Sequence, residues 1–382
     1  MNSIENQEIQ GTEKKNSEGG FSLIEMIVAM VIFLIVTSSI YGLLSMGSVS
    51  RNRSSRRTDV LKNARAAIHL IGRDALNAGL GYHQSGALVP DGFLSTNLGL
   101  PIDTDNTRDV LTSVIAGDNI YPNDLQNGNT DIIAFAYRDQ DFNAGDSMGL
   151  DQSLAGSSSS VVRLNLDANS NAICAPADCS VTPAPLPSIN KHDLVLVESD
   201  TTQVAVMVTD VIDNKNVDFA TSDPMGINQA YDASGVDRSL LRRCNPGGGI
   251  SDNCTSNISS LKRFFWISYE VKPDGTLVRK TYGNNTGQPF DQQVRERPLA
   301  YNVRDLQFTY VLENGVVTNN PGAGPDGVAG TTDDTPNDFN LIRQVTVTIE
   351  VQSTENDEQT GEPVSITLRG TFSTRNLEYD VG

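Results

Sequence analysis

The side chains of this sequence that have the type and spacing to do chemistry are carboxylates and cysteines, and they do not form a catalytic set. The only histidines, His69, His83 and His192, lack the spacing of metal ligands. No Gly-x-x-x-x-Gly-Lys-Ser/Thr segment is present to cradle a phosphate, and no His-Glu-x-x-His zinc motif. With 28 Lys and Arg against 47 Asp and Glu, the net charge is −19, which would repel nucleic acid. We predict a protein that is not an enzyme and has no nucleic-acid partner.

The four cysteines form two local pairs in the sequence. Four residues separate Cys174 from Cys179, and nine separate Cys244 from Cys254. Neither spacing is that of a zinc ribbon. Even, local pairing in a loop-rich acidic chain is typical of disulfides formed in an oxidising compartment. We predict the bridges Cys174–Cys179 and Cys244–Cys254, each contributing about 2–4 kcal/mol at most to stability.

One carboxylate, Glu25, interrupts an apolar segment that runs from Phe21 to Met46. The segment is long enough to cross a membrane, which takes about 20 apolar residues. A secretory signal peptide has a shorter apolar core, of about 7–15 residues, and its small-residue cleavage site follows that core. Here the small pair Gly19-Gly20 comes before it. A plain anchor has no use for a carboxylate, which costs about 2.5–3.5 kcal/mol at the bilayer centre, so Glu25 needs a partner.

The order Gly20-Phe21-Ser22-Leu23-Ile24-Glu25, followed by an unbroken apolar helix, resembles the signal of the type IV prepilin family. The resemblance implies that a membrane-bound prepilin peptidase removes residues 1–20 by cutting between Gly20 and Phe21, and then methylates the new amino group of Phe21. It also implies that Glu25 pairs with the α-amino group at Phe21 of a neighbouring subunit in a filament. In an apolar helix bundle, such a pair offsets the burial cost of both charges and fixes the axial register.

The first candidate calcium site lies in the stretch GAGPDGVAGTTDD. Its carboxylates, Asp326, Asp333 and Asp334, flank glycines that let the backbone turn and offer carbonyl oxygens. Calcium takes six to eight such oxygen ligands. The stretch resembles the calcium loop of the major pseudopilins of type II secretion. The alternative is a solvated acidic turn.

The second candidate calcium site lies in DQDFNAGD. Asp139, Asp141 and Asn143 have the one-three-five spacing of an EF-hand loop. The glycine comes one position late, however, and the glutamate expected at position twelve is missing. A solvated acidic turn is again the alternative, and no cofactor other than calcium is indicated anywhere in the chain.

Two signals for membrane topology disagree. The positive-inside rule compares two lysines before the apolar segment with four arginines soon after it, and would place the large domain in the cytoplasm. The paired cysteines and the prepilin signal favour the other side. We follow these and predict a single-pass inner-membrane protein whose head lies in the periplasm before assembly and on an extracellular pilus afterwards, where the tip best accommodates a bulky head.

A single helix is predicted from about Ser22 to Ala78, roughly 85 Å long at 1.5 Å per residue. Residues 21–46 form its membrane or filament-core half, and residues 47–80 form an amphipathic half. Gly79 and Gly81 supply a stop signal. The apolar face of the second half recurs at three- and four-residue steps and comprises Leu61, Ala64, Ile68, Ile71, Ala75 and Leu76.

Beyond residue 81 the apolar pattern switches to the period of two that indicates strands. The predicted strands are Asp131–Tyr137, Val161–Leu166, Asp193–Val197, Gln203–Val211, Phe264–Val271, Thr276–Tyr282, Val303–Leu312, Ile342–Val351 and Ser365–Ser373. The turn Lys272-Pro273-Asp274-Gly275 indicates a hairpin. Because no strand alternates with a helix, we predict an α+β fold: a pilin-like ladle with one long helix packed under a mostly antiparallel β head, residues 81–382, with long loops.

The last two predicted strands, in IRQVTVTIEVQ and VSITLRGTFSTRN, resemble the closing strands of PilW-type minor pilins. The resemblance implies a minor pilin that enters or primes a type IV pilus together with major and minor pilins and the inner-membrane assembly platform. One alternative is a pseudopilin of a type II secretion system. The other is an adhesin or ligand-binding head that uses the helix only for delivery.

Overall fold

The computed structural model describes most of the chain between residues 20 and 374. The described ranges are 20–83, 85–101, 109–145, 147–151, 161–166, 189–199, 203–212, 216–228, 258–322, 336–358 and 360–374. All four cysteines, and the carboxylates of the first calcium stretch, lie outside them. The chain divides into two compact units between Ser55 and Arg56, and each is described by itself.

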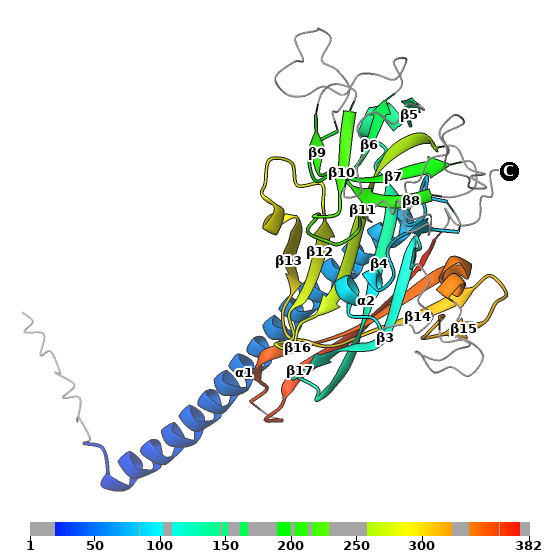
Figure 1. The fold of residues 1–382 in the computed structure, drawn as a ribbon. Helices are drawn as coiled ribbons and strands as arrows, with labels where there is room; N and C mark the ends of the chain where they lie inside the picture. Colours follow the sequence, from blue (N-terminus) through cyan, green and yellow to red (C-terminus); the bar gives the residue numbers. More distant parts are fainter. Residues whose placement is uncertain are drawn as a thin grey trace, which may run out of the picture. The chain divides into compact units, whose positions relative to one another are not determined.

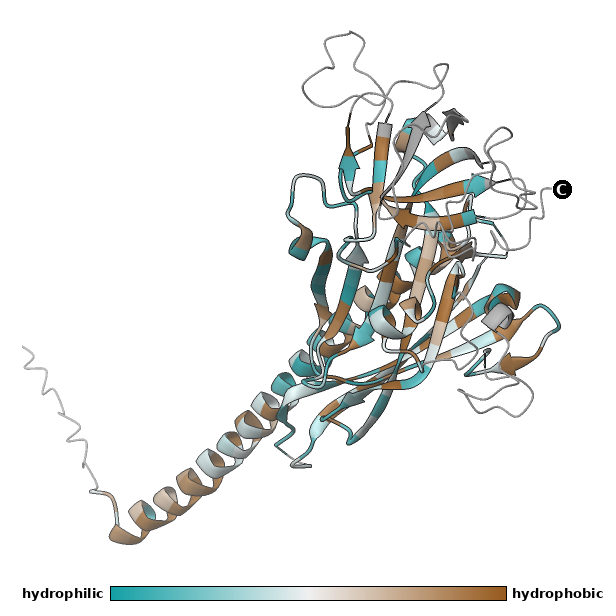
Figure 2. Cartoon of the chain, viewed as in Figure 1, coloured by the Kyte–Doolittle hydropathy of each residue, from teal (hydrophilic) through white to brown (hydrophobic). Residues whose placement is uncertain are grey.

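The long amino-terminal helix is α1, Leu23–Asn77 (Figure 1), which confirms the predicted bounds to within one residue. Two glycines follow its end, and both Gly79 and Gly81 have the positive φ that favours glycine, 79° and 62°. In the first unit, the large apolar side chains of α1 are exposed and form the apolar stretch coloured brown in Figure 2.

In the second unit, α1 contributes a buried stripe to a core shared with both sheets. The stripe consists of Val60, Ala64, Ala67, Ile71 and Ala75. Three positions of the predicted apolar face, Ala64, Ile71 and Ala75, are buried as expected. Two others, Leu61 and Ile68, are half-buried. The prediction is wrong for Leu76, which is 44% exposed. One residue beyond Ala75 is about 100° round the helix, so Leu76 points away from the core.

The first sheet contains thirteen strands among the described residues, most of them paired antiparallel, as predicted. Its parallel pair is β1 with β8. The strands are β1 (Ala87–Leu88), β2 (Val110–Leu111), β3 (Val114–Asn123), β4 (Gly128–Arg138), β5 (Met148–Asp151), β6 (Val161–Leu166), β7 (Leu194–Ser199), β8 (Gln203–Met207), β9 (Asp210–Val211), β10 (Asn216–Ala220), β11 (Ile258–Val271), β12 (Leu277–Tyr282) and β13 (Val294–Ala300).

The second sheet has the strand order β15-β14-β16-β17. Its strands are β14 (Val303–Leu312), β15 (Val317–Thr318), β16 (Ile342–Asn356) and β17 (Pro363–Ser373). Short helices complete the described elements: α2 (Phe93–Leu98) and the 3-10 turns η1 (Phe142–Gly145), η2 (Phe290–Gln292) and η3 (Pro336–Leu341). Every predicted strand is present, although the segment predicted as one strand from Gln203 forms β8 and β9.

The long strand β11 organises the first sheet, because it pairs with β4, β5, β7 and β12. Its side chains alternate between two cores. Ile267 and Tyr269 face the core that contains α1, whereas Phe264 and Trp266 face a second core. Trp266 is buried and stacks on Tyr282 with ring centroids 4.0 Å apart, so its ring serves to pack the core.

The hairpin between β11 and β12 has the predicted turn. The Gly275 N–H donates to the Lys272 carbonyl at 2.8 Å, and Gly275 has a φ of 78°. A side chain at this position would also meet Leu125, 2.2 Å from an ideal Cβ. Glycine is therefore required here both by the backbone conformation and by the close neighbour. This turn fixes the register of β12 against β11, and β13 pairs in turn with β12.

Candidate functional site

The predicted cleavage junction precedes the first helical residue. Gly20 and Phe21 lie outside α1, and the Phe21 side chain is 86% exposed. No atom lies within 4 Å of the position that a Cβ on Gly20 would occupy. The junction is therefore exposed chain without regular secondary structure next to a helix start, where a peptidase can engage the backbone.

Glu25 caps the start of α1. Its Oε2 accepts the backbone N–H of Ser22 at 3.0 Å, and the Ser22 carbonyl accepts the first helical N–H, from Met26, at 3.2 Å. This is half of a capping box, in which an acid at the third helical position satisfies the backbone N–H of the N-cap residue. A carboxylate in the first turn also interacts favourably with the helix dipole. The Ser-x-x-Glu pattern in the sequence is the signal that could have revealed this role.

The exposed apolar face of α1 is long enough to cross a membrane. From Leu23 to Met46, its large apolar side chains are at least half exposed. Burying such surface is worth about 25 cal/mol per Å². This half of the helix is thus built to be covered by lipid or by other apolar helices.

Comparison with known families decides what this arrangement is. Residues 15–41 match the family model described as the prokaryotic N-terminal methylation motif. The chain carries a type IV prepilin signal. The match includes the Gly20–Phe21 junction and Glu25, and it supports a type IV pilin-like or pseudopilin-like protein that prepilin peptidase processes. No curated protein and no solved structure matches the chain.

The second predicted calcium loop lies on η1, where one of its carboxylates already has a cationic partner. Asp139 Oδ2 is 2.6 Å from Nη2 of Arg263, and its Oδ1 accepts the Asp141 N–H at 3.0 Å. Asn143 donates to the Ser147 carbonyl at 3.4 Å. Among the described residues, no three His, Cys, Asp or Glu side chains are grouped so as to hold a metal ion. Both calcium loops stay predictions, the first because its residues lie outside the described ranges.

A Gly-x-Ser-x-Gly spacing at residues 145–149 is the one hydrolase-like pattern in the sequence, and sequence reasoning missed it. In hydrolases this serine sits on a sharp turn from a strand into a helix. Here Ser147 follows the 3-10 turn η1 and precedes strand β5. The local structure therefore does not match a nucleophile turn.

Sequence reasoning also missed a buried acid on α1, Asp74, which is fully enclosed. The Tyr269 hydroxyl donates to its Oδ2 at 2.6 Å, and Arg279 Nε donates to the same oxygen at 2.9 Å. The Tyr137 hydroxyl donates to Oδ1 at 3.4 Å, and Arg73 Nη2 lies 3.2 Å from it. Burial and the nearby Asp74 charge raise the pKa of Tyr269, which keeps the phenol a neutral donor. No local pattern marks Asp74, because its partners other than Arg73 lie far away in the sequence.

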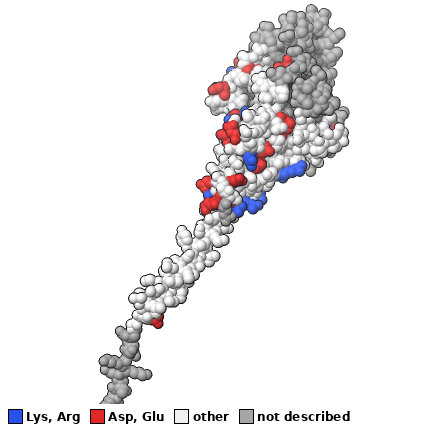
Figure 3. All heavy atoms as spheres, turned by 90° about the horizontal axis from the view of Figure 1, so that it is seen from below, with Lys and Arg blue, Asp and Glu red and all other residues white. Residues whose placement is uncertain are grey.

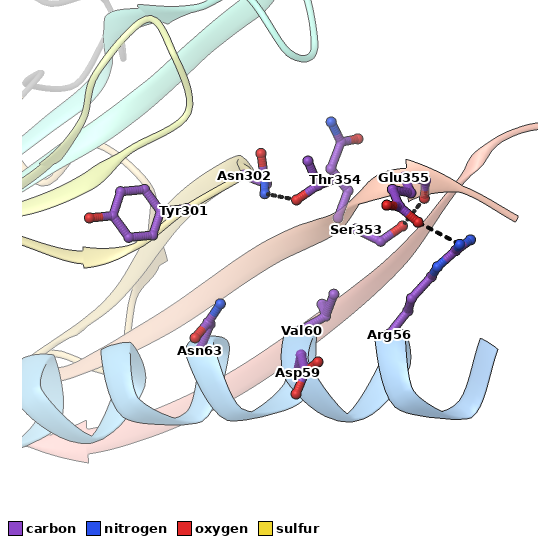
Figure 4. A pocket seen from close by; sticks show the side chains of 10 residues that line it. Arg56, Asp59, Val60, Asn63, Tyr301, Asn302, Ser353, Thr354 and Glu355 are labelled. Carbon is purple, nitrogen blue, oxygen red and sulfur yellow. Dashed lines mark hydrogen bonds and ion pairs between the residues drawn. The ribbon is translucent and has the colours of Figure 1, made fainter. Parts of the chain in front are cut away.

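A shallow polar groove of about 300 Å³ lies between α1 and β16 (Figure 4). Its charges are already paired: Arg56 lies 2.5 Å from Glu355 and also donates to the Asn356 carbonyl. Asn302, in the turn between β13 and β14, donates to Thr354 Oγ1 at 2.9 Å. The groove holds no nucleophile beside a base. It serves as a surface that fixes the helix against the second sheet rather than as a reaction site.

Proposed function

We propose that this chain is a PilW-type minor pilin that enters or primes a type IV pilus, with a structural and assembly role. The observation that carries the proposal is the prepilin signal at the start of a helix whose apolar half is exposed. That half has no partner of its own among the described residues of its unit. Lateral packing with the helices of major and minor pilins would cover it.

The amino-terminal chemistry gives the order of events. Prepilin peptidase cuts after Gly20 and methylates Phe21, and the assembly platform in the inner membrane then extracts the mature subunit. Glu25 lies four residues from the new amino terminus. Its capping bond to the Ser22 N–H uses one oxygen, and a carboxylate has acceptor capacity for further donors. The α-amino group of a neighbouring subunit can thus be bound without breaking the cap.

The head supports the minor-pilin subtype through its last two long strands. β16 and β17 pair continuously from Gln344 opposite Ser373 to Gln352 opposite Ser365, and they are packed on α1 through one face. These are the strands whose sequence resembles the PilW-type closing pair. We place the head in the periplasm before assembly and on the extracellular pilus, at its tip, afterwards. The local cysteine pairs, predicted to be disulfides, support that compartment.

The decisive measurement is the intact mass of the protein from native membranes and from a sheared surface fraction. We expect a species that begins at methylated Phe21 in the sheared fraction. Gly20→Ala should block processing, whereas Gly19→Ala, one residue from the junction, should be processed normally. An uncleaved chain confined to the membrane, or efficient maturation of Gly20→Ala, would overturn the proposal.

Two substitutions at Glu25 separate its two roles. Glu25→Gln keeps an acceptor for the Ser22 N–H but removes the charge, whereas Glu25→Val removes both. If the charge pair guides assembly, both variants insert into the membrane and both are depleted from sheared filaments. Normal incorporation of Glu25→Gln would show that only the helix cap matters.

The same signal also supports a pseudopilin of a type II secretion system. Glu25 argues against the tip pseudopilin of such a system, which lacks this carboxylate, but not against its other subunits. Deleting each assembly system in turn and following the sheared fraction distinguishes the two. Loss of the surface form only when the secretion system is absent would favour the pseudopilin.

A further inference from the structure

The two faces of the β12–β13 hairpin carry different charges. On one face, Lys280 lies 2.6 Å from Glu270 and 3.6 Å from Glu296, and Lys272 also pairs with Glu296. On the face toward α1, the register places Arg295 opposite Thr281 and Arg297 opposite Arg279. Alternation along a strand puts the three arginines on one side. That side is therefore basic, although the whole chain carries a net charge of −19 and acidic groups are prominent on the face shown in Figure 3.

A groove of about 230 Å³ opens on this basic face. Arg279, Thr281 and Arg295 line it from the hairpin. Tyr137 of β4 and Phe265 of β11 form an aromatic wall, with ring centroids 5.6 Å apart. The groove thus combines guanidinium donors, a hydroxyl and an apolar surface, the mixture typical of small-ligand sites.

The arginines of the groove lack enough acidic partners. Arg279 is occupied by Asp74. Arg295 Nε is buried and has no hydrogen-bond partner, and no ion pair to Arg297 is present within the described residues. Burial, followed by the charges of Arg297 and Arg279, lowers the pKa of Arg295, and no carboxylate acts in the other direction. A bound anion would remove this unfavourable electrostatic energy.

Asp74 shows how a carboxylate is received in this part of the fold. Its oxygens lie against the guanidinium groups of Arg279 and Arg73 and the hydroxyls of Tyr269 and Tyr137. Tyr137 belongs both to that network and to the wall of the groove. A carboxylate bound in the groove would meet the same kinds of donors, a guanidinium group from Arg295 and a hydroxyl from Thr281. Planar guanidinium groups match carboxylates because they can donate two parallel hydrogen bonds.

We propose that this groove is a binding site for a carboxylate ligand, held by Arg295 and Thr281 against the aromatic wall of Tyr137 and Phe265. The carboxylate can come from an acidic peptide segment of another protein chain or from a free small carboxylate. The site does not depend on the filament role, because it is built entirely from residues of the second unit.

The test is calorimetric titration of the full-length protein in detergent with three probes. One is a synthetic acidic peptide, STENDEQTGEP, taken from residues 353–363 of this chain. The others are citrate and sulfate. We expect saturable binding of the peptide or of citrate that weakens at least tenfold in Arg295→Gln. The matched control is Lys272→Gln, which removes one positive charge from the turn between β11 and β12, where Lys272 pairs with Glu296 on the opposite face of the sheet, and should leave the affinity unchanged.

Each outcome decides a separate point. Binding of the peptide but not of citrate assigns the site to a polypeptide partner, and the reverse assigns it to a free small carboxylate. Arg295→Lys keeps the charge but loses the paired donors, so it should show an intermediate loss. Sulfate binding as tightly as either carboxylate, equal losses in Lys272→Gln and Arg295→Gln, or no saturable binding would overturn the proposal. Fluorescence of Trp266 in each variant verifies that the fold is intact.

Discussion

The two halves of α1 lie in one continuous helix, but they obtain their packing partners differently. From Leu23 to Met46, the large apolar side chains are at least half exposed. From Val60 to Ala75, a stripe of small and apolar side chains is buried under both sheets. Each half also carries one acid with a structural contact. Glu25 accepts a single backbone N–H, whereas Asp74 is surrounded by two guanidinium groups and two phenols.

This difference shows which contacts the chain makes for itself and which it leaves to other molecules. The second half is satisfied by residues of its own chain, so its substitutions should change the free energy of unfolding. The first half has its apolar surface and most of its Glu25 acceptor capacity still available. Substitutions there should change insertion or assembly while the head remains as stable as before.

The largest expected effect on stability comes from Asp74→Ala. It leaves the Arg279 guanidinium buried without its carboxylate, and breaking a buried ion pair in this way costs about 3–5 kcal/mol. Urea unfolding of the full chain in detergent, followed by Trp266 fluorescence, measures the loss. Glu25→Ala is the matched control on the other half and should leave that midpoint unchanged. Equal destabilisation by both variants would contradict the comparison.

A second buried acid, Asp131, should behave differently from Asp74 because no Lys or Arg of the described residues forms an ion pair with it. Its oxygens accept the N–H groups of Asn119 at 2.9 Å and Phe308 at 2.7 Å. Burial is the main cause that raises its pKa from 3.8 to about 7, and the charges of Asp118 and Asp305 add to it. The folded state thus holds the proton more tightly than the unfolded state does.

It follows that stability should fall as pH rises from about 4 to about 7 and then level off. A shift of about three pKa units corresponds to about 4 kcal/mol at most. The urea midpoint measured between pH 4 and pH 8 shows the slope, which Asp131→Asn should reduce. Part of the slope should remain, because burial also raises the pKa of Asp193, to about 6, despite Arg263 nearby. A slope of opposite sign would show that Asp131 is ionised throughout.

Substituting glycines in the two halves of α1 should give the next largest difference in head stability. A Cβ at Gly72 would lie 2.2 Å from the ring of Phe372 on β17, whereas nothing lies within 4 Å of one at Gly42. Gly72→Ala forces the ring to move and should cost about 1–3 kcal/mol of head stability. Gly42→Ala should leave the head unchanged. Unfolding curves of the two single variants measure these effects. The double variant Gly72→Ala with Phe372→Leu, which lacks the ring, tests whether the ring causes the loss of stability.

The smallest effect on stability is expected for an ion pair at the start of the second unit. Arg56 lies 2.5 Å from Glu355, but the Glu355 side chain is 72% exposed. Exposed ion pairs contribute about 0.2–1 kcal/mol and are screened by salt. A double-mutant cycle with Arg56→Ala and Glu355→Ala should give a coupling in that range that shrinks in 1 M NaCl. A coupling above about 2 kcal/mol would show that the groove in Figure 4 is a stronger anchor than its exposure implies.

The sequence predicted those elements whose local pattern agrees with their final environment. β14 has the predicted bounds, and β16 and β17 contain the predicted segments, because each alternates between a more buried and a more exposed face. The start of α1 could be predicted because the apolar segment begins directly after Gly20, and Ser22 stands just before the first helical residue. The cleavage signal was equally readable, because its residues are contiguous.

Elements without such a pattern were missed for identifiable reasons. β3 contains Gly117, Asn119 and Pro122 and has an irregular register, so its alternation is broken. β13 is mostly exposed and contains Pro298, which is typical of an edge strand. The roles of Asp74 and of the three arginines depend on partners brought together by the fold. No spacing in the sequence could reveal them.

The order in which these partners occur along the chain has a consequence for folding. The stripe on α1 packs against β16, and Gly72 against Phe372 on β17, about 300 residues later in the sequence. Such contacts have high contact order, and long loops must close before they form. The part of the stripe that packs against β16 and β17 therefore stays uncovered until these last strands are available. On the export route proposed above, a chaperone that shields amphipathic helices would have its main opportunity during that interval.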